Sequence, residues 1–143
     1  MDVSELRQKI LRAIDEGKPD DRAKRRAEVD TAKAAYARFL EHVAVPLFRQ
    51  AQSILKAESR PFTVYAPADG VKLVSDASSS TFLEFVLDTA SERPQVIARV
   101  SRALPKGVTV EEQSLAPGKA IAELGDDDVA GFFVKEIPKL VKK

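Results

Sequence analysis

The hydrophobic pattern of the chain changes its period near Pro61. Upstream of Pro61, apolar residues recur at helical spacing in a stretch that holds one glycine. Downstream, short runs of β-favouring residues alternate with polar ones and are separated by turn residues. The pattern predicts the α+β class: N-terminal helices, one short and one long, packed on a mostly antiparallel sheet of five or six strands, with a C-terminal helix. We expect a single domain, helical over 1–60, a β-meander over 61–124 and a terminal helix over 125–143.

The short helix is expected at the start of the chain. Asp2 can cap its first turn, and the segment 17–19, which reads Gly-Lys-Pro, is expected to end it. The apolar positions that share one face of this helix are Val3, Leu6, Ile10, Ala13 and Ile14.

The long helix is expected to run from about Asp20 to about Ser59. Pro46 removes a backbone donor and crowds the carbonyl of His42, so the helix is expected to kink or break just before it. At 100° per residue, one stripe should face the core. Its members are Val29, Ala32, Tyr36, Phe39, Val43, Leu47 and Ile54.

After Tyr36 the apolar arc of the long helix widens to roughly 200°, because Leu40, Phe48 and Leu55 extend it on one flank. One face of a sheet cannot cover so wide an arc. Either the other helices or a second copy of the chain must cover the remainder. The favoured interpretation is a non-enzymatic interaction module that self-associates, most simply as a dimer, with Leu40, Phe48 and Leu55 in the contact. Another protein is the alternative partner for the same contact.

The β-rich half predicts a meander with short connections. Leu83, Phe85 and Leu87 alternate with polar residues and should face the core, while Glu84 and Arg99 are placed to meet across strands. The outer face of the sheet is expected to carry Tyr65, Lys72, Phe82, Ile97, Arg99 and Thr109. The expected strands are 62–66, 71–75, 81–89, 95–102, 108–113 and 119–124.

Composition narrows the function classes. The chain has 143 residues, a formal net charge of +1 and no cysteine. Disulfides and thiolate metal sites are therefore excluded, and no global field favours nucleic acid or anionic lipid. The N-terminus lacks the apolar stretch of a secretory signal, and no run approaches the length of a membrane span. We expect a cytoplasmic protein without a membrane partner.

A nucleic-acid site is the second interpretation. It depends on the densest basic cluster of the chain, which could contact three or four phosphates. Acidic residues flank this cluster and can pair with it at helical spacing, so a solvated helix face explains the same residues. The cluster consists of Arg22, Lys24, Arg25 and Arg26.

A ligand or catalytic pocket between helix and sheet is the third interpretation. Tyr36, His42 and Tyr65 are the side chains most able to orient a polar group there. His42 is the only histidine, so a metal centre built on imidazoles is not expected. The acidic run 126–128 suits the start of the terminal helix better than a cation site. The sequence predicts no catalytic residues and no cofactor.

Overall fold

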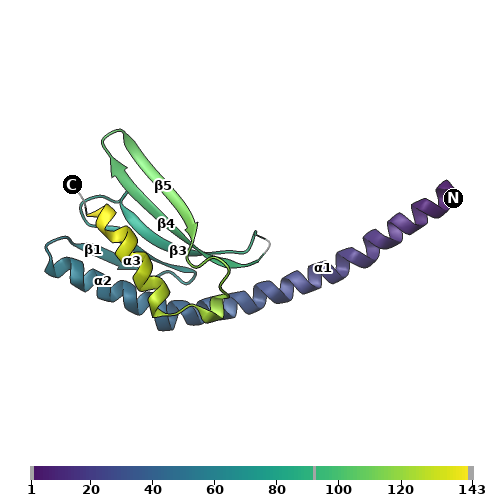
Figure 1. Ribbon diagram of the computed structural model, residues 1–143, viewed down its shortest axis with the longest axis horizontal. Helices are drawn as coiled ribbons and strands as arrows, with labels where there is room; N and C mark the ends of the chain where they lie inside the picture. The colour runs from purple at the N-terminus through teal and green to yellow at the C-terminus, as the bar shows by residue number, and fades with distance from the viewer. Residues whose placement is uncertain (1, 92, 142–143) are drawn as a thin grey trace.

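Helices cover one face of a five-stranded antiparallel sheet, and the first helix extends far beyond the sheet (Figure 1). This arrangement confirms the predicted α+β class. The computed structural model describes residues 2–91 and 93–141, without the side chains of residues 13–21. In chain order the elements are α1 (Val3–Phe39), the π-helical segment η1 (Leu40–Ala44), α2 (Val45–Ala57), β1 (Phe62–Tyr65), β2 (Gly70–Ser75), β3 (Phe82–Asp88), β4 (Gln95–Leu104), β5 (Gly107–Ser114), the 3₁₀ turn η2 (Ile121–Glu123) and α3 (Asp126–Leu140).

The short and the long predicted helices are parts of one continuous helix. Asp2 caps α1 as expected, since its carboxylate accepts a hydrogen bond from the N–H of Ser4. The backbone then stays helical from Val3 to Phe39, so the expected end at residues 17–19 is wrong. Glycine and proline lower helix stability locally, and the strong helix formers on both sides of this segment outweigh that local cost. The predicted apolar positions Ala13 and Ile14 lie outside the described side chains.

The strands pair strictly in sequence order, β1-β2-β3-β4-β5. The sixth predicted strand, 119–124, is wrong. That segment forms η2, which packs against α1 through the buried side chains of Ile121 and Leu124. Pro117 and Gly118 precede it, and Gly118 has a φ of +79°, so the chain turns away from the sheet instead of adding a strand.

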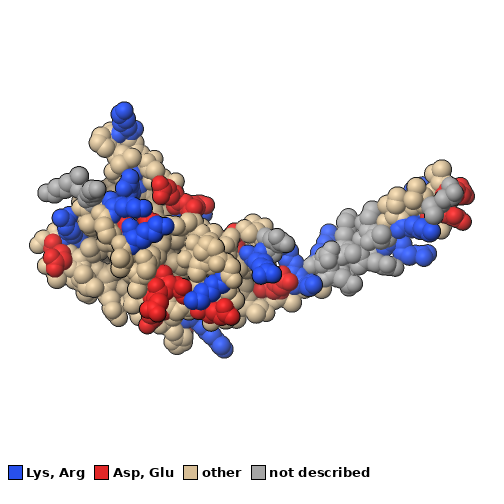
Figure 2. Space-filling view, viewed as in Figure 1, with Lys and Arg blue, Asp and Glu red and all other residues tan. Residues whose placement is uncertain are grey.

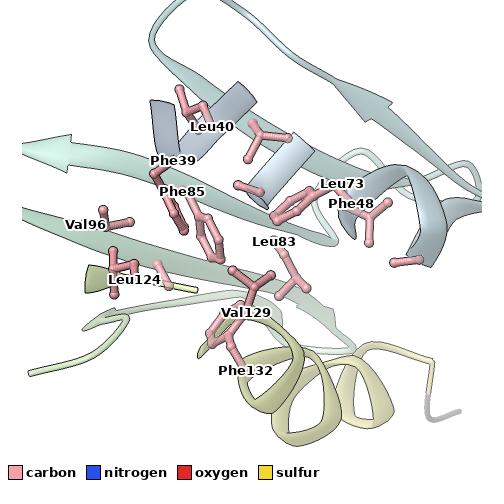
Figure 3. Close-up of a cluster of buried hydrophobic side chains, with 14 of the residues drawn as sticks. Phe39, Leu40, Phe48, Leu73, Leu83, Phe85, Val96, Leu124, Val129 and Phe132 are labelled. Atoms are coloured by element: carbon pink, nitrogen blue, oxygen red, sulfur yellow. The ribbon is translucent and has the colours of Figure 1, made fainter. Parts of the chain in front are cut away.

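The core lies between the sheet and the helices (Figure 3). Leu83 and Phe85 on β3 point into it and are fully buried, as the alternation predicts. Phe85 lies at its centre, because its ring contacts Phe39 of α1, Phe48 of α2 and Phe132 of α3. One aromatic side chain of the sheet therefore touches all three helices.

The break expected before Pro46 is confirmed as a π-helical segment. The N–H of Val45 bonds the carbonyl of Leu40, five residues back, and Pro46 then lies in the first turn of α2, where a missing donor is tolerated. A π turn holds one extra residue, so the core-facing side moves by about 100°. The stripe predicted for a straight helix therefore fails after the break, and Ile54 is 62% exposed. The buried positions of the helices are Ala32, Tyr36, Phe39 and Leu40 before the break and Ala44, Phe48, Ala51 and Leu55 after it.

The wide apolar arc of α2 is covered within the chain. Leu40, Phe48 and Leu55 are all buried, and the ring of Phe48 lies between Phe85 of β3 and Phe133 of α3. The physical reason is that α3 packs beside α2, so sheet and helix share the arc. Of the two alternatives left open by the sequence, the other helices provide the cover. These three side chains are not available as a contact surface of the folded chain.

The start of α3 provides a test of helix capping. Asp128 accepts a hydrogen bond of 2.9 Å from the N–H of Gly125 and another of 2.9 Å from Nζ of Lys119. The first of these bonds and then the second lower the pKa of the Asp128 carboxyl. Capping therefore explains Asp128, as expected, while Asp126 and Asp127 stay exposed.

We expect Asp128→Ala to lower the free energy of unfolding by about 1 kcal/mol at neutral pH. Because the folded pKa is lowered, this contribution is present above the unfolded pKa and is lost as the pH falls below about 4. Urea unfolding of both proteins at pH 7 and in acid measures the difference. Asp127→Ala is the matched control, and an equal loss in that variant would contradict the capping role.

Candidate functional site

The N-terminal half of α1 projects from the body of the protein (Figure 1). We call residues 2–24 the arm. All its described side chains are exposed, and Val29 is the first partly buried residue among the described side chains of α1. At 1.5 Å per residue, α1 spans about 55 Å, and its N-terminal part lies beyond the sheet (Figure 1).

Large apolar side chains line one side of the arm. Val3 is 81% exposed, Leu6 49% and Ile10 51%. Their spacings of three and four residues place them within about 60° of each other on the helix. Leu11, on the neighbouring flank, is also exposed. We call Val3, Leu6 and Ile10 the arm stripe.

The arm stripe is separated from the core by a polar spacer. Residues 15–28 contain no large apolar side chain, so this stretch of helix has nothing to bury against the sheet. At 1.5 Å per residue, the 19 residues from Ile10 to Val29 place the arm stripe roughly 28 Å away from the start of the core. This gap is the sequence signal that could have identified the stripe as uncovered.

Arg25 attaches the base of the arm to the body. Its guanidinium donates to the carbonyl oxygens of Thr89 at 2.8 Å and Ser91 at 2.9 Å, in the loop between β3 and β4. Asp88 orders this loop by accepting hydrogen bonds from the Ser91 hydroxyl and the N–H of Ala90, and these bonds lower the pKa of its carboxyl. Arg25 thereby helps set the direction in which the arm leaves the body.

The contact of Arg25 with the β3–β4 loop engages one of the four residues of the predicted basic cluster. Arg22, Lys24 and Arg26 are exposed, whereas the guanidinium of Arg25 bonds the backbone of the body. Figure 2 shows Lys and Arg interspersed with Asp and Glu on the visible face. Nucleic-acid binding by the cluster stays a prediction, with Arg25 engaged in a structural contact.

The three predicted pocket residues, Tyr36, His42 and Tyr65, are divided between two separate hollows. Tyr36 and Tyr65 line a hollow of about 590 Å³ beside the turn between β1 and β2. His42 is exposed and lines a second hollow of about 370 Å³ between α1 and η2. The structure therefore does not bring the three side chains together.

The hydroxyl of Tyr36 is used by the fold. Its single O–H is shared between the carbonyl oxygens of Asp69 at 3.0 Å and Phe85 at 3.3 Å, which ties α1 to the turn before β2 and to β3. Desolvation by burial, followed by the charges of Asp69 and Glu84, raises the pKa of this hydroxyl, so it stays a donor at neutral pH. A group already committed to two carbonyls is poorly placed to orient a ligand.

The outer face of the sheet carries a row of alternating charges across four strands: Lys72, Glu84, Arg99 and Glu112. The predicted meeting of Glu84 and Arg99 is confirmed at 3.4 Å, and Arg99 also pairs with Glu112 at 2.8 Å. Both are partly exposed pairs, which contribute little to stability singly but limit what this face can bind. Thr109 pairs with Arg102 and lies three residues before Glu112 on β5. Because an odd spacing along a strand changes the face, Thr109 lies on the opposite face of the sheet, and its predicted place on the outer face is wrong.

The chain matches no protein-family model, no curated protein and no solved structure. The geometry alone therefore carries the functional argument.

Metal sites and membrane-spanning helices are two further features that would indicate a function. Among the described residues, no three His, Asp or Glu side chains lie close enough together to share a metal ion. No helix within 2–91 or 93–141 has both the length and the apolar character needed to cross a bilayer. The cytoplasmic location stays a prediction.

Proposed function

We propose that this protein is a non-enzymatic interaction module that self-associates through its arm. The observation that carries the proposal is the arm stripe: Val3, Leu6 and Ile10 lie on one side of a projecting helix, and no residue that the structure describes covers them. This keeps the expected self-association but moves the contact from residues 40–55 of the predicted long helix to the segment predicted as the short helix.

An isolated helix is a poor state for such a segment. Short helices without tertiary contacts are marginal in water, because most helical stability in proteins comes from packing an apolar face. The polar spacer prevents the arm stripe from folding back along the same straight helix onto the core. A partner outside the chain is therefore the source of cover that the geometry favours.

A second copy fits the arm better than an unrelated surface. Spacings of three and four residues make a two-helix seam, in which Val3, Leu6 and Ile10 of one arm meet the same residues of the other. Asp2 directly precedes the seam residue Val3, and Arg7 directly follows the seam residue Leu6. In a parallel coiled coil, residues at these two flanking positions face each other across the seam, so Asp2 of each arm faces Arg7 of the other arm. The seam is thus complementary to itself in both shape and charge.

The expected association is weak. Each apolar side chain of the seam contributes roughly 1 kcal/mol when its exposed area is buried, and the six of them must offset the entropy lost on association. Six such contributions correspond to a dissociation constant of roughly 40 μM before that entropy cost is subtracted, so we expect a dissociation constant weaker than about 40 μM and a dimer that depends on concentration.

The test is a pair of double variants with the same spacing and the same added charge. Leu6→Glu with Ile10→Glu places both carboxylates in the arm stripe, and Ser4→Glu with Gln8→Glu places them on the other side of the helix. We expect the first double variant to associate roughly a hundredfold more weakly and the second to behave as wild type. Far-ultraviolet circular dichroism against protein concentration, with sedimentation equilibrium, measures arm helicity and mass together.

Helicity in the wild type should rise with concentration, because the arm is stabilised by its partner. Wild-type helicity that does not change with concentration would overturn the arm contact, as would equal effects of the two double variants. A rise in helicity only on adding lipid vesicles would assign the stripe to a membrane surface and would also overturn it.

A further inference from the structure

The two edge strands of the sheet, β1 and β5, differ in how far their outward backbone groups are covered by the rest of the chain. At the β1 edge, the outward N–H of Val64 donates to Oε1 of Gln52 at 2.6 Å, and α2 packs along this strand. At the other edge, β5 contacts β4 on one side and is open on the other (Figure 1). Unprotected edges are ready templates for pairing with another strand.

The register identifies which backbone groups of β5 are open. The N–H of Leu115 bonds the carbonyl of Val96, and bonded pairs alternate along an antiparallel ladder. Val108, Val110 and Glu112 therefore direct their N–H and C=O groups away from β4. Within the part of the chain that the structure describes, no other segment hydrogen-bonds these groups.

The side chains of the open edge are apolar where the hairpin extends past the helices. Val108 is 55% exposed and Val110 is 56% exposed, both on the outer face of the sheet. Lys106, in the turn between β4 and β5, lies at one end of the valine pair, and Glu112 lies at the other. The edge thus carries a positive charge, two valines and a negative charge in succession.

We propose that the β5 edge pairs antiparallel with β5 of a second copy about a twofold axis at Thr109. In this register Val108 faces Val110 of the partner copy and Lys106 faces the partner copy's Glu112. All four valines then meet on the outer face, and the two Thr109 side chains meet on the inner face, a favourable cross-strand pair. This contact is separate from the arm contact and does not depend on it.

The two neighbouring registers of the strand pair are less favourable because of the side chains that they bring face to face. With the axis at Glu111, the two Glu111 carboxylates face each other directly, and like charges in that position are destabilising. With the axis at Val110, each Val108 faces Glu112 and only one valine pair remains. The charge order of the strand therefore selects the axis at Thr109.

The absence of cysteine allows single-cysteine variants to read the register. At the proposed axis, the two Thr109 Cα atoms are about 4.5 Å apart, within disulfide range, while the two residues at 111 are separated by about 13 Å along the strands. We expect Thr109→Cys to form a covalent dimer at least about tenfold faster than Glu111→Cys on mild oxidation. Val134→Cys, at an exposed site on α3, measures random collision.

The cross-linking is done in the full chain that carries Leu6→Glu and Ile10→Glu, so that the arm contact cannot bring the copies together. Faster dimer formation at residue 109 than at 110, 111 and 134 supports the proposal. Rates at 109 to 111 equal to that at 134 would overturn the pairing and leave the edge to an extended segment of another protein. Fastest cross-linking at 110 or 111 would overturn the register. Neither result affects the arm, which is read separately from helicity.

Discussion

Phe48→Ala should lower the free energy of unfolding by about 3–5 kcal/mol, which is a large part of the stability of an ordinary domain. Phe48 is fully buried, with its ring centre 5.0 Å from that of Phe85 and 5.1 Å from that of Phe133. Truncation leaves a cavity where α2, α3 and β3 meet. The loss includes the edge-to-face contacts as well as the buried area.

Urea unfolding measures this loss, with Val134→Ala as the control for an apolar truncation in α3. Val134 is 77% exposed, so its truncation should change the free energy of unfolding by less than about 0.5 kcal/mol. The folded fraction of Phe48→Ala should associate like wild type, because the arm is unchanged. A variant that kept full stability but lost self-association would return Phe48 to an interface and contradict its place in the core.

Gly70→Ala should destabilise the protein by about 1–3 kcal/mol although it adds a single methyl group. A Cβ at this position would lie 2.8 Å from the carbonyl oxygen of Phe85 and 3.8 Å from the hydroxyl of Tyr36. The nearer atom belongs to the backbone of β3, which cannot move without opening the pairing with β2. The substitution also disturbs the carbonyl that Tyr36 bonds.

Gly131→Ala is the matched substitution with the opposite expected sign. Gly131 lies inside α3, and a Cβ there would meet nothing within 4 Å. Alanine should therefore stabilise the helix by about 0.5–1 kcal/mol. Thermal and urea unfolding of both variants measure the contrast, and a shift of both in the same direction would contradict the close approach at Gly70.

Most features of the sheet could be predicted because they depend on residues that are close together in the sequence. Alternation assigned Leu83 and Phe85 to the core, and turn residues with short connections predicted antiparallel neighbours. The same reasoning placed Glu84 opposite Arg99. It failed at 119–124, where a short apolar run carries no sign of whether it will add to a sheet edge or pack on a helix.

The sequence predicted that the first 60 residues are helical, but it did not predict which side of the helix is buried after Pro46. Pro46 indicated a break, yet a π turn and a kink have the same sequence signal and different consequences for the buried face. The π turn moved the buried face by one residue and exposed Ile54. It also left Leu40, Phe48 and Leu55 beneath the sheet and α3, where no local pattern could have placed them.

The sequence by itself determined the α+β class, the positions of the five strands, the antiparallel meander and the acidic start of the terminal helix. These properties follow from period, turn chemistry and caps, which act over a few residues. Only the tertiary structure decided which apolar surfaces stay open. Cover depends on where distant elements pack: α3 covers α2, α2 and Gln52 protect the β1 edge, and nothing in the described chain covers the arm stripe or the β5 edge. The proposed contacts lie on those two open surfaces because burial is a property of the folded chain and not of any single element.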